Sequence, residues 1–240
     1  MTPFEESARP RSMRLRDIAG HKFFLLFLFL LSYLLLYSYK EHGGLGYFVF
    51  RGLAVAVTLM SVYAVSFRRS LVFLGLALAI PAVVEHVQIV RSDVSALSIL
   101  TSALTLAFDA FIIVVIFRRV FFHGDSDSET IFGALCIYLL VGLSFASIYR
   151  LVSAVQPHAF YLDPHTNLRS IPNRFDLIYY SFGTMTSLGA AGITAVSDQA
   201  RSLTVIEAII GLLYLAVMIS RLVGTYRASR RDEYRVVEKV

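Results

Sequence analysis

Six long apolar runs dominate the sequence, and each is close to the ~20 residues that an α-helix needs to cross a bilayer. They extend from about Phe23 to Tyr39, Tyr47 to Phe67, Leu71 to Val90, Ala96 to Phe117, Ile131 to Tyr149 and Ser202 to Val223. None shows the two-residue alternation of a barrel strand, so all six are predicted to be helices. Hydrophobic residues make up 57% of the chain and charged residues 16%, against about 25% charged in soluble domains. The sequence therefore predicts an all-α membrane protein with six transmembrane helices.

The distribution of Lys and Arg predicts the orientation of the chain. With six spans both termini lie on one side, and that side carries fifteen of the 22 basic residues, whereas the other carries seven. Cytoplasmic segments are the more basic, so we expect a multi-pass cell-membrane protein with both termini in the cytoplasm. Tyr37 and Tyr39 at the end of the first run, and Lys40 after it, lie where a cleavage site would need small residues. That run is therefore predicted to be a retained anchor rather than a signal peptide.

A polar linker at residues 123–129 is the one strong break in composition inside the chain. It separates the first four apolar runs from the last two, and Ser128 or Asp127 could cap the helix that follows it. The predicted segments are a cytoplasmic N-terminal segment (1–22), a four-helix front module (23–122), the cytoplasmic linker (123–129), a second membrane module (130–224) and a cytoplasmic tail (225–240). The tail could extend the last helix.

A seventh apolar stretch, residues 175–186, is too short to cross a bilayer. Pro172 and Asn173 predict a helix start before it, with Asp176 in the first turn. The six residues that follow, 187–192, include two glycines and do not favour a continued helix. A half-membrane helix followed by irregular backbone is tolerated at membrane depth only where it lines a cavity or is buried in protein. The sequence therefore predicts a re-entrant pore helix and loop between the fifth and sixth spans.

Three stretches around this loop carry a resemblance to a known family. Residues 131–143, 176–186 and 201–224 resemble the outer helix, the pore helix and the inner helix of bacterial potassium-channel-family proteins. The resemblance implies that residues 130–224 are a pore module and that the protein is a cyclic homotetramer in membrane lipid. It also implies passive conduction of monovalent cations, potassium or sodium, with no enzymatic activity, no cofactor and no nucleic-acid partner.

The loop departs from the selectivity filter of that family, whose signature is T-V-G-Y-G followed by Asp. Thr186 precedes the aligned residues, and Ser187 aligns without gaps with the threonine of the signature. The threonine, the valine and the first glycine are kept or conservatively changed, whereas the tyrosine, the second glycine and the aspartate are replaced. The six aligned residues are Ser187, Leu188, Gly189, Ala190, Ala191 and Gly192. The resemblance implies that Thr186 to Gly192 form the constriction, where backbone carbonyls and the Ser187 hydroxyl replace part of the hydration of the ion.

The replaced residues predict an altered upper half of this constriction. A left-handed backbone at Ala191 would cost about 1–2 kcal/mol in each subunit. We therefore expect the lower ion sites to be kept and the upper ones to be widened, absent or occluded, with potassium selectivity relaxed. A one-residue slip would give Gly192 the role of the second glycine, but Ile193 and Thr194 continue the family register without a gap.

Two other interpretations of the pore stay open. The pore helix would point its partly negative C-terminal end at the central cavity, which favours cations. Arg174 and Arg201, which would lie near the outer mouth, and the missing filter aspartate instead favour an anion-tolerant pore. The altered loop leaves a second alternative, a non-conducting channel-fold protein that acts as a sensor or an assembly partner. Voltage sensing through the fourth span is not expected, because residues 96–117 contain no arginine.

Five residues of different chemical types lie three or four positions apart along the last span. They are Glu207, Gly211, Tyr214, Met218 and Arg221. They share one helical face, which we expect to face the pore or a neighbouring helix rather than lipid. Glu207 matches an acidic residue of the family's inner helix and is predicted to support the pore loop from behind, with an ion site as the alternative. Gly211 is either a hinge or a point of close helix packing.

The remaining polar residues have structural interpretations that we favour over functional ones. Asp109 is expected to make an inter-helix hydrogen bond rather than an ion or proton site. Glu85 is expected to pair with Arg51, and the alternative is that His86 senses pH. Three outer-loop residues that could bind a metal match no firm motif: His158, Asp163 and His165. No catalytic motif is present, so neither a metal site nor an enzyme is predicted.

Overall fold

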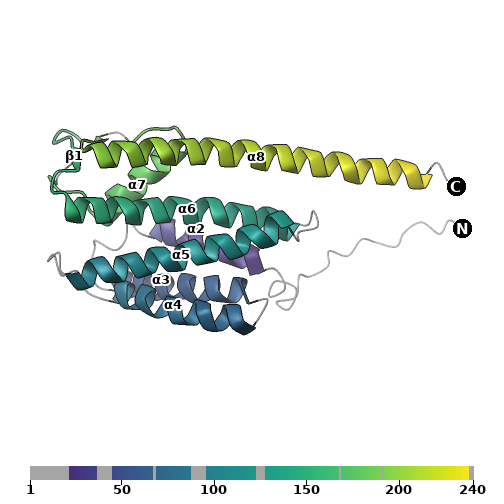
Figure 1. Ribbon diagram of the computed structural model, residues 1–240, viewed down its shortest axis with the longest axis horizontal. Helices are drawn as coiled ribbons and strands as arrows, with labels where there is room; N and C mark the ends of the chain where they lie inside the picture. The colour runs from purple at the N-terminus through teal and green to yellow at the C-terminus, as the bar shows by residue number, and fades with distance from the viewer. Residues whose placement is uncertain are drawn as a thin grey trace, which may run out of the picture.

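The computed structural model describes residues 22–36, 45–66, 69–87, 96–122, 128–167, 169–190 and 192–237. Within these residues, six long helices run roughly along one axis (Figure 1). They are α2 (Lys22–Leu36), α3 (Leu45–Ala64), α4 (Arg69–Val87), α5 (Ala96–Phe122), α6 (Ser128–Val155) and α8 (Asp198–Val237). A short helix, α7 (Arg174–Met185), and two short strands, β1 (Phe160–Leu162) and β2 (Ile193–Ala195), lie between α6 and α8 in the sequence. Each predicted apolar run overlaps one long helix.

Three of these helices are long and apolar enough to cross a membrane: Ile99–Phe122 of α5, Glu129–Val155 of α6 and Asp198–Arg221 of α8. The apolar parts of α2, α3 and α4 are shorter within the described residues. The 15 residues of α2 extend about 22 Å at 1.5 Å per residue, less than the ~30 Å of a bilayer core. The ends of three predicted spans, at 37–39, 67 and 88–90, lie outside the described residues. An all-helical membrane protein is supported, and the count of six spans stays a prediction.

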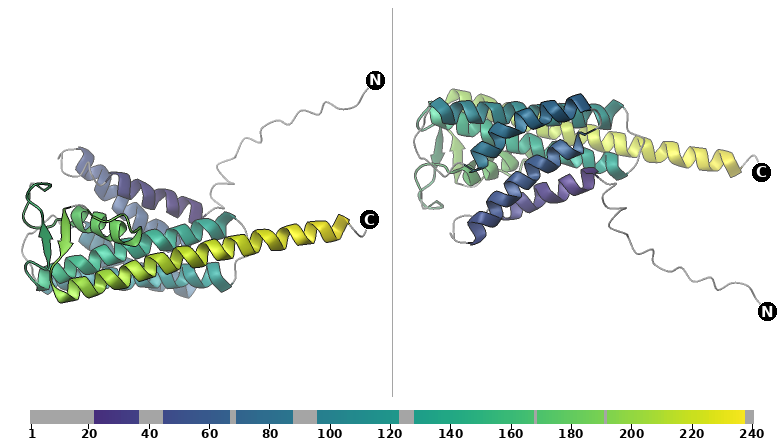
Figure 2. Two further views of the ribbon diagram at one scale, coloured as in Figure 1. Left: turned by 90° about the horizontal axis from the view of Figure 1, so that it is seen from above. Right: turned by 90° about the horizontal axis from the view of Figure 1, so that it is seen from below.

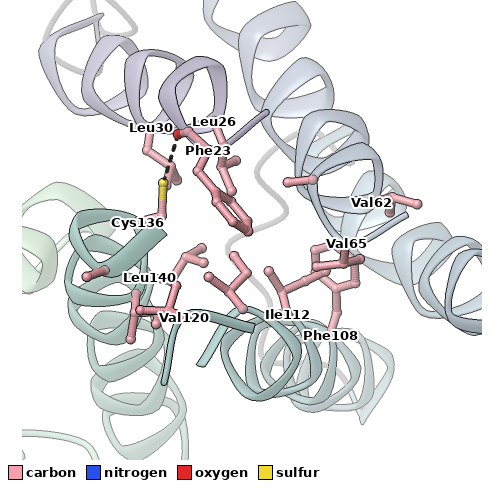
Figure 3. Packing of buried hydrophobic residues seen from close by; sticks show 14 of the residues in the cluster. Phe23, Leu26, Leu30, Val62, Val65, Phe108, Ile112, Val120, Cys136 and Leu140 are labelled. Carbon is pink, nitrogen blue, oxygen red and sulfur yellow. Dashed lines mark hydrogen bonds between the residues drawn. The ribbon is translucent and has the colours of Figure 1, made fainter. Parts of the chain in front are cut away.

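The front helices share their core with α6. Successive helices pack side by side from α2 to α6, and α6 also packs against α2. Buried side chains from all five helices form one cluster. Figure 3 shows part of it and labels Phe23, Leu26, Leu30, Val62, Val65, Phe108, Ile112, Val120, Cys136 and Leu140. The predicted linker at 123–129 is therefore not a boundary in the core, and its residues 123–127 lie outside the described part of the chain.

Polar contacts join the beginnings of α2 and α6 at one end of this core. The backbone N–H of Phe23 donates to Glu129 Oε2 at 3.0 Å, and the Cys136 thiol donates to the carbonyl oxygen of Phe23 at 3.3 Å. Glu129 therefore satisfies one of the N–H groups that a helix start leaves without an intrahelical partner. Predicted capping by Asp127 lies outside the described residues, as does the side chain of Ser128.

Helix α8 is the longest element, with 40 residues, and its C-terminal part extends beyond the ends of α5 and α6 (Figure 1). At 1.5 Å per residue it measures about 60 Å, twice the thickness of a bilayer core. The predicted extension of the last helix into residues 225–237 is confirmed. Figure 2 shows α7 beside the first half of α8, with α2 and α3 on the other side of α7.

Strands β1 and β2 form a two-stranded antiparallel sheet, a feature that the sequence did not predict. Phe160 pairs with Ala195, Tyr161 with Thr194, and Leu162 with Ile193. In both strands the outer residues are buried and the central one is exposed. This sheet ties the segment after α6 to the segment before α8, so it fixes both ends of the chain that carries α7.

Candidate functional site

Helix α7 begins where the sequence predicts it. Asn173 is its N-cap, and its side chain accepts a hydrogen bond from the backbone N–H of Asp176 at 2.9 Å. The Asp176 carboxylate accepts one in return from the backbone N–H of Asn173 at 2.8 Å. This reciprocal capping box satisfies two N–H groups at the helix start, and Asp176 also places a negative charge near the positive end of the helix.

The far end of α7 lies beside the middle of the apolar part of α8. A Cβ added at Gly211 would lie 2.6 Å from the carbonyl oxygen of Met185, the last residue of α7. Gly211 follows the start of α8 at Asp198 by 13 residues, or about 20 Å along the helix. The chain then returns to β2, directly before α8. Helix α7 and the following loop therefore run to about the middle of the apolar part of α8 and back.

The loop after α7 folds back against the helix. Thr186 ends α7, and its N–H and hydroxyl both donate to the carbonyl oxygen of Phe182, at 3.0 and 2.6 Å. The N–H of Gly189 donates to the carbonyl oxygen of Gly183 at 3.0 Å. A Cβ at Gly183 would lie 2.8 Å from the carbonyl oxygen of Gly189, so only a glycine in α7 allows the loop to come this close.

Two residues directly after the end of α7 have a left-handed backbone. Ser187 has a φ of 58° and Gly189 a φ of 81°. This conformation is easy for glycine and costs a residue with a side chain roughly 1–2 kcal/mol. Thr186, Ser187, Leu188 and Gly189 are all exposed, and Leu188 has 80% of its surface exposed. The segment thus presents backbone carbonyls, two hydroxyls and one large apolar side chain.

The return segment is held by the loop that follows β1. Ala190 accepts a hydrogen bond at its carbonyl oxygen from the N–H of Ile193, at 3.2 Å. The carbonyl oxygen of Gly192 accepts from the N–H of Asp163 at 2.8 Å and from Asn167 Nδ2 at 2.9 Å. Gly192 has a φ of 81°, and a Cβ there would collide with Thr166. Ala191, with its predicted strain, lies outside the described residues.

Asp163 has a local structural partner. Its carboxylate accepts a hydrogen bond from the backbone N–H of His165 at 2.9 Å, within the turn that holds Gly192. Among the residues that the structure describes, no group of three or more His, Cys, Asp or Glu side chains could hold a metal ion.

A buried carboxyl group connects the three helices around the loop. Glu207 of α8 is fully buried. The Tyr149 hydroxyl of α6 lies 2.5 Å from Glu207 Oε2, and Ser181 Oγ of α7 contacts Glu207 Oε1. Ser181 Oγ also lies 2.7 Å from the carbonyl oxygen of Gly142 in α6. Glu207 thus stands behind α7, where the sequence analysis expected a supporting residue, but the sequence did not identify Tyr149 or Ser181.

Three aromatic rings pack beside this carboxyl group. Tyr149, Phe160 and Tyr180 lie edge to face in a triangle, with all three pairs of ring centres 5.3 Å apart. The Tyr180 hydroxyl lies 2.8 Å from Thr204 Oγ1, which joins α7 to α8 a second time. Such edge-to-face pairs contribute about 0.5–1.5 kcal/mol each beyond burial, so the middle of α7 is well fixed to α6, β1 and α8.

The predicted shared face of α8 packs against neighbouring helices of the same chain. It carries Glu207, Gly211, Tyr214, Met218 and Arg221. Below Glu207 and Gly211, the Tyr214 hydroxyl donates to the carbonyl oxygen of Ala134 in α6 at 2.6 Å. Met218 packs against the shared core, and the Arg221 guanidinium lies 4.7 Å from the centre of the Phe121 ring of α5. The pore-facing alternative for this face does not fit the packing within one chain.

The structure describes only some of the polar residues for which the sequence favours a structural role. Asp109 is half-buried in α5, and it makes a polar or electrostatic interaction. The side chains of Glu85 and His86 lie outside the described part of the chain, so the expected pair with Arg51 stays a prediction. An unpredicted contact joins α6 to α5, because Arg150 donates to Ser102 Oγ at 2.5 Å.

Residues 134–228 match a family model described as "Ion channel" (Ion_trans_2). The matched stretch is less than half of the chain and contains most of α6, all of α7 with its loop, and most of α8. No curated protein and no solved structure matches the chain. The match therefore supports an ion-channel family and an ion-channel function for the part of the chain that holds the half-length helix.

Proposed function

We propose that the chain assembles as a homotetramer into a membrane pore that conducts monovalent cations passively. The observation that carries the proposal is the course of α7, which ends beside the middle of the apolar part of α8 and continues into an exposed loop. A re-entrant pore helix would have this course, and the segment lies inside the stretch that is similar to ion channels. The loop from Thr186 to Gly192 would be the constriction, and α8 would line the cavity below it.

The surface of α8 supports assembly from several copies. Only 11% of its most apolar stretch is buried within one chain, against 50% of the corresponding stretch of α6. Large apolar side chains are exposed along its length, among them Val205, Ile209, Leu213 and Val217. One chain cannot enclose a pore with one loop, so further copies must complete the ring and cover part of this face, with lipid on the rest. In the orientation that we propose, both termini are cytoplasmic and β1 and β2 lie at the outer end.

The chemistry of the loop supports cations with relaxed selectivity. The residues from Thr186 to Leu188 are exposed, so their carbonyls would be available to replace part of an ion's hydration shell, and the C-terminal end of α7 adds a partial negative charge. Higher in the loop, the carbonyls of Ala190 and Gly192 accept hydrogen bonds from the chain itself. Those two oxygens are therefore directed to protein donors, which favours fewer ion sites than the T-V-G-Y-G filter has.

The exposed Leu188 favours a second candidate, a channel-fold protein that does not conduct. Four leucine side chains around the axis would make an apolar constriction, and such constrictions can close a pore by excluding water. A protein of this kind would act as a sensor or an assembly partner. An anion-tolerant pore is the third outcome, and the experiment below separates all three.

Flux from liposomes containing the purified protein tests the proposal, with opposed potassium, sodium and chloride gradients. The loop variant is Gly189→Pro, because proline can neither adopt the φ of 81° nor donate the N–H that reaches Gly183. We expect cation flux from the wild type and none from the variant, with the assembly of both checked by native mass spectrometry. Chloride flux would support the anion-tolerant form, and absence of flux from an intact tetramer would support the non-conducting one.

A second variant tests the expected relaxation of the filter. The double change Ala190→Tyr with Ala191→Gly restores the family's residues at these two positions. We expect it to raise the preference for potassium over sodium. An unchanged ratio would mean that these two positions do not set the selectivity.

A further inference from the structure

Glu207 is the one buried acidic or basic side chain in the part of the chain that the structure describes. It lies in the membrane-spanning part of α8, where an ionised group is costly unless it is well compensated. Its two oxygens contact two hydroxyl groups, Tyr149 of α6 and Ser181 of α7. The Ser181 hydroxyl has a second acceptor, the carbonyl oxygen of Gly142, at 2.7 Å.

Counting protons in this cluster determines the charge of the carboxyl group. Three short oxygen–oxygen contacts join Gly142, Ser181, Glu207 and Tyr149, and each needs one proton to be a hydrogen bond. A carboxylate only accepts, while Ser and Tyr each donate once. An ionised Glu207 would therefore leave three contacts with two protons. The Ser181 oxygen would then face the Gly142 oxygen or the carboxylate with no proton between them.

A protonated carboxyl group supplies the missing proton. Tyr149 then donates to Glu207 Oε2, the carboxylic acid donates from Oε1 to Ser181 Oγ, and Ser181 donates to the carbonyl oxygen of Gly142. All three contacts become hydrogen bonds, and they form a single chain across α6, α7 and α8. No net charge remains in a surrounding of low dielectric constant, where unpaired polar groups are costly.

We propose that Glu207 is a neutral carboxylic acid in the folded protein, and that its proton completes a hydrogen-bond chain that holds α7 in place. Ser181 lies one helical turn before Met185, so this chain fixes the end of α7 from which the loop departs. Glu207 is thus a positioning residue, and its effect on conduction rests on the proposed pore function. Its protonation does not, because it follows from the folded chain alone.

The surroundings of the carboxyl group agree with a neutral acid. From α6 the titratable groups that interact with it are Tyr149 and Tyr138, and from α7 it is Tyr180. Tyrosine hydroxyls are neutral at ordinary pH, so none of these groups offers the positive charge that would stabilise a carboxylate.

Infrared spectroscopy of the protein in lipid tests the protonation directly. A carboxylic acid has a carbonyl stretch well separated from the bands of a carboxylate. We expect the wild type to show this band at neutral pH, where an exposed glutamate is ionised, and the Glu207→Gln variant to lack it. Ser181→Ala should shift the band, because the acid loses its acceptor. Identical spectra for the wild type and Glu207→Gln in this region would overturn the proposal.

A matched variant controls for general disturbance of the helix contacts. Tyr214→Phe removes the hydrogen bond from the Tyr214 hydroxyl to the carbonyl oxygen of Ala134, another contact between α8 and α6, but removes no group of the chain through Glu207. We expect it to keep the acid band unshifted. A band lost equally in Tyr214→Phe and Ser181→Ala would mean that it reports loose packing and not this chain.

Thermal stability gives a second measurement that does not depend on ion flux. Gln can donate to Ser181 and accept from Tyr149, so Glu207→Gln should keep the neutral-pH unfolding temperature, whereas Glu207→Leu should lower it. A proton bound by the folded but not by the unfolded chain makes stability fall as pH rises. We expect this alkaline loss in the wild type to be reduced in Glu207→Gln. A Gln variant that fails to fold, or that has the same pH profile as the wild type, would contradict the proposal.

Discussion

At the scale of single residues, glycines determine how closely α7 approaches its neighbours. A Cβ at Gly142 of α6 would lie 2.8 Å from the Phe182 ring, and one at Gly183 or Gly211 would meet backbone atoms at 2.8 or 2.6 Å. Each of the three contacts involves α7, and the three glycines lie in three different helices, α6, α7 and α8. The flexible end of a side chain could move away from such an added Cβ, but a helix or loop backbone has little room to do so.

Gly211→Ala should displace α7 and its loop. Its Cβ would overlap the carbonyl oxygen of Met185, and overpacking of this kind costs about 1–3 kcal/mol. We expect a lower unfolding temperature in detergent and a change in flux or ion selectivity. Gly52→Ala in α3 is the matched control, because a Cβ there meets nothing within 4 Å. If both variants behave like the wild type, the close approach of α7 and α8 is wrong.

At the scale of the elements, α7 is stabilised mainly from outside. It has only 12 residues, and isolated helices of that length are marginal in water. The capping box holds its first turn, Tyr180 and Ser181 join it to α8 and α6, and the loop hydrogen bond to Gly183 closes its last turn. The helix can therefore be expected to respond to changes at its cap.

Asn173→Ala should weaken α7 at its first turn. Removing an N-cap acceptor costs roughly 1 kcal/mol, and here the partner Asp176 also loses the reciprocal arrangement. We expect a modest fall in unfolding temperature, measured alongside Asn173→Asp, which keeps an acceptor oxygen at the cap and should remain close to the wild type. Equal losses in the two variants would show that the side chain contributes something other than capping.

The elements differ in how well the sequence predicts them. Long apolar runs and the Pro172–Asn173 signal located the helices and the start of α7, because both depend on local residues. Strands β1 and β2 were missed, since three residues are too few to show an alternating pattern and their pairing joins distant segments. The end of α6 was also missed, because the helix continues past Arg150 to Val155. The Arg150 guanidinium donates a hydrogen bond to Ser102 of α5, so this charged residue does not end the helix.

The candidate site was predictable in part for the same reason. The loop Thr186–Gly192 and the acidic residue Glu207 stand out in the sequence by composition and by family resemblance. Ser181 and Tyr149 do not, because a serine or tyrosine in an apolar helix has many possible partners. Which one it contacts depends on the relative rotation and depth of three helices, and no local pattern encodes that.

At the scale of the whole molecule, the front helices form part of the surroundings of α7. Tyr33 of α2 and Phe50 of α3 stack with ring centres 5.0 Å apart. They belong to one buried cluster with Ile178 of α7, and Phe182 packs against it. Phe182 is also the residue whose carbonyl accepts from Thr186 at the start of the loop. A disturbance in α2 or α3 therefore has a short packed route to the loop that follows α7.

Phe50→Ala tests this route, because Phe50 lies outside the region that matches ion channels. Deleting a buried phenylalanine side chain costs about 3–5 kcal/mol, and the cavity here would adjoin Ile178 and Phe182. We expect reduced flux or altered selectivity as well as lower stability. Phe73→Ala of α4 makes the same chemical change at a side chain that is 74% exposed and should leave both properties nearly unchanged. If Phe50→Ala lowers stability yet leaves the flux and selectivity of the folded protein unaltered, the front helices hold α7 without influencing conduction.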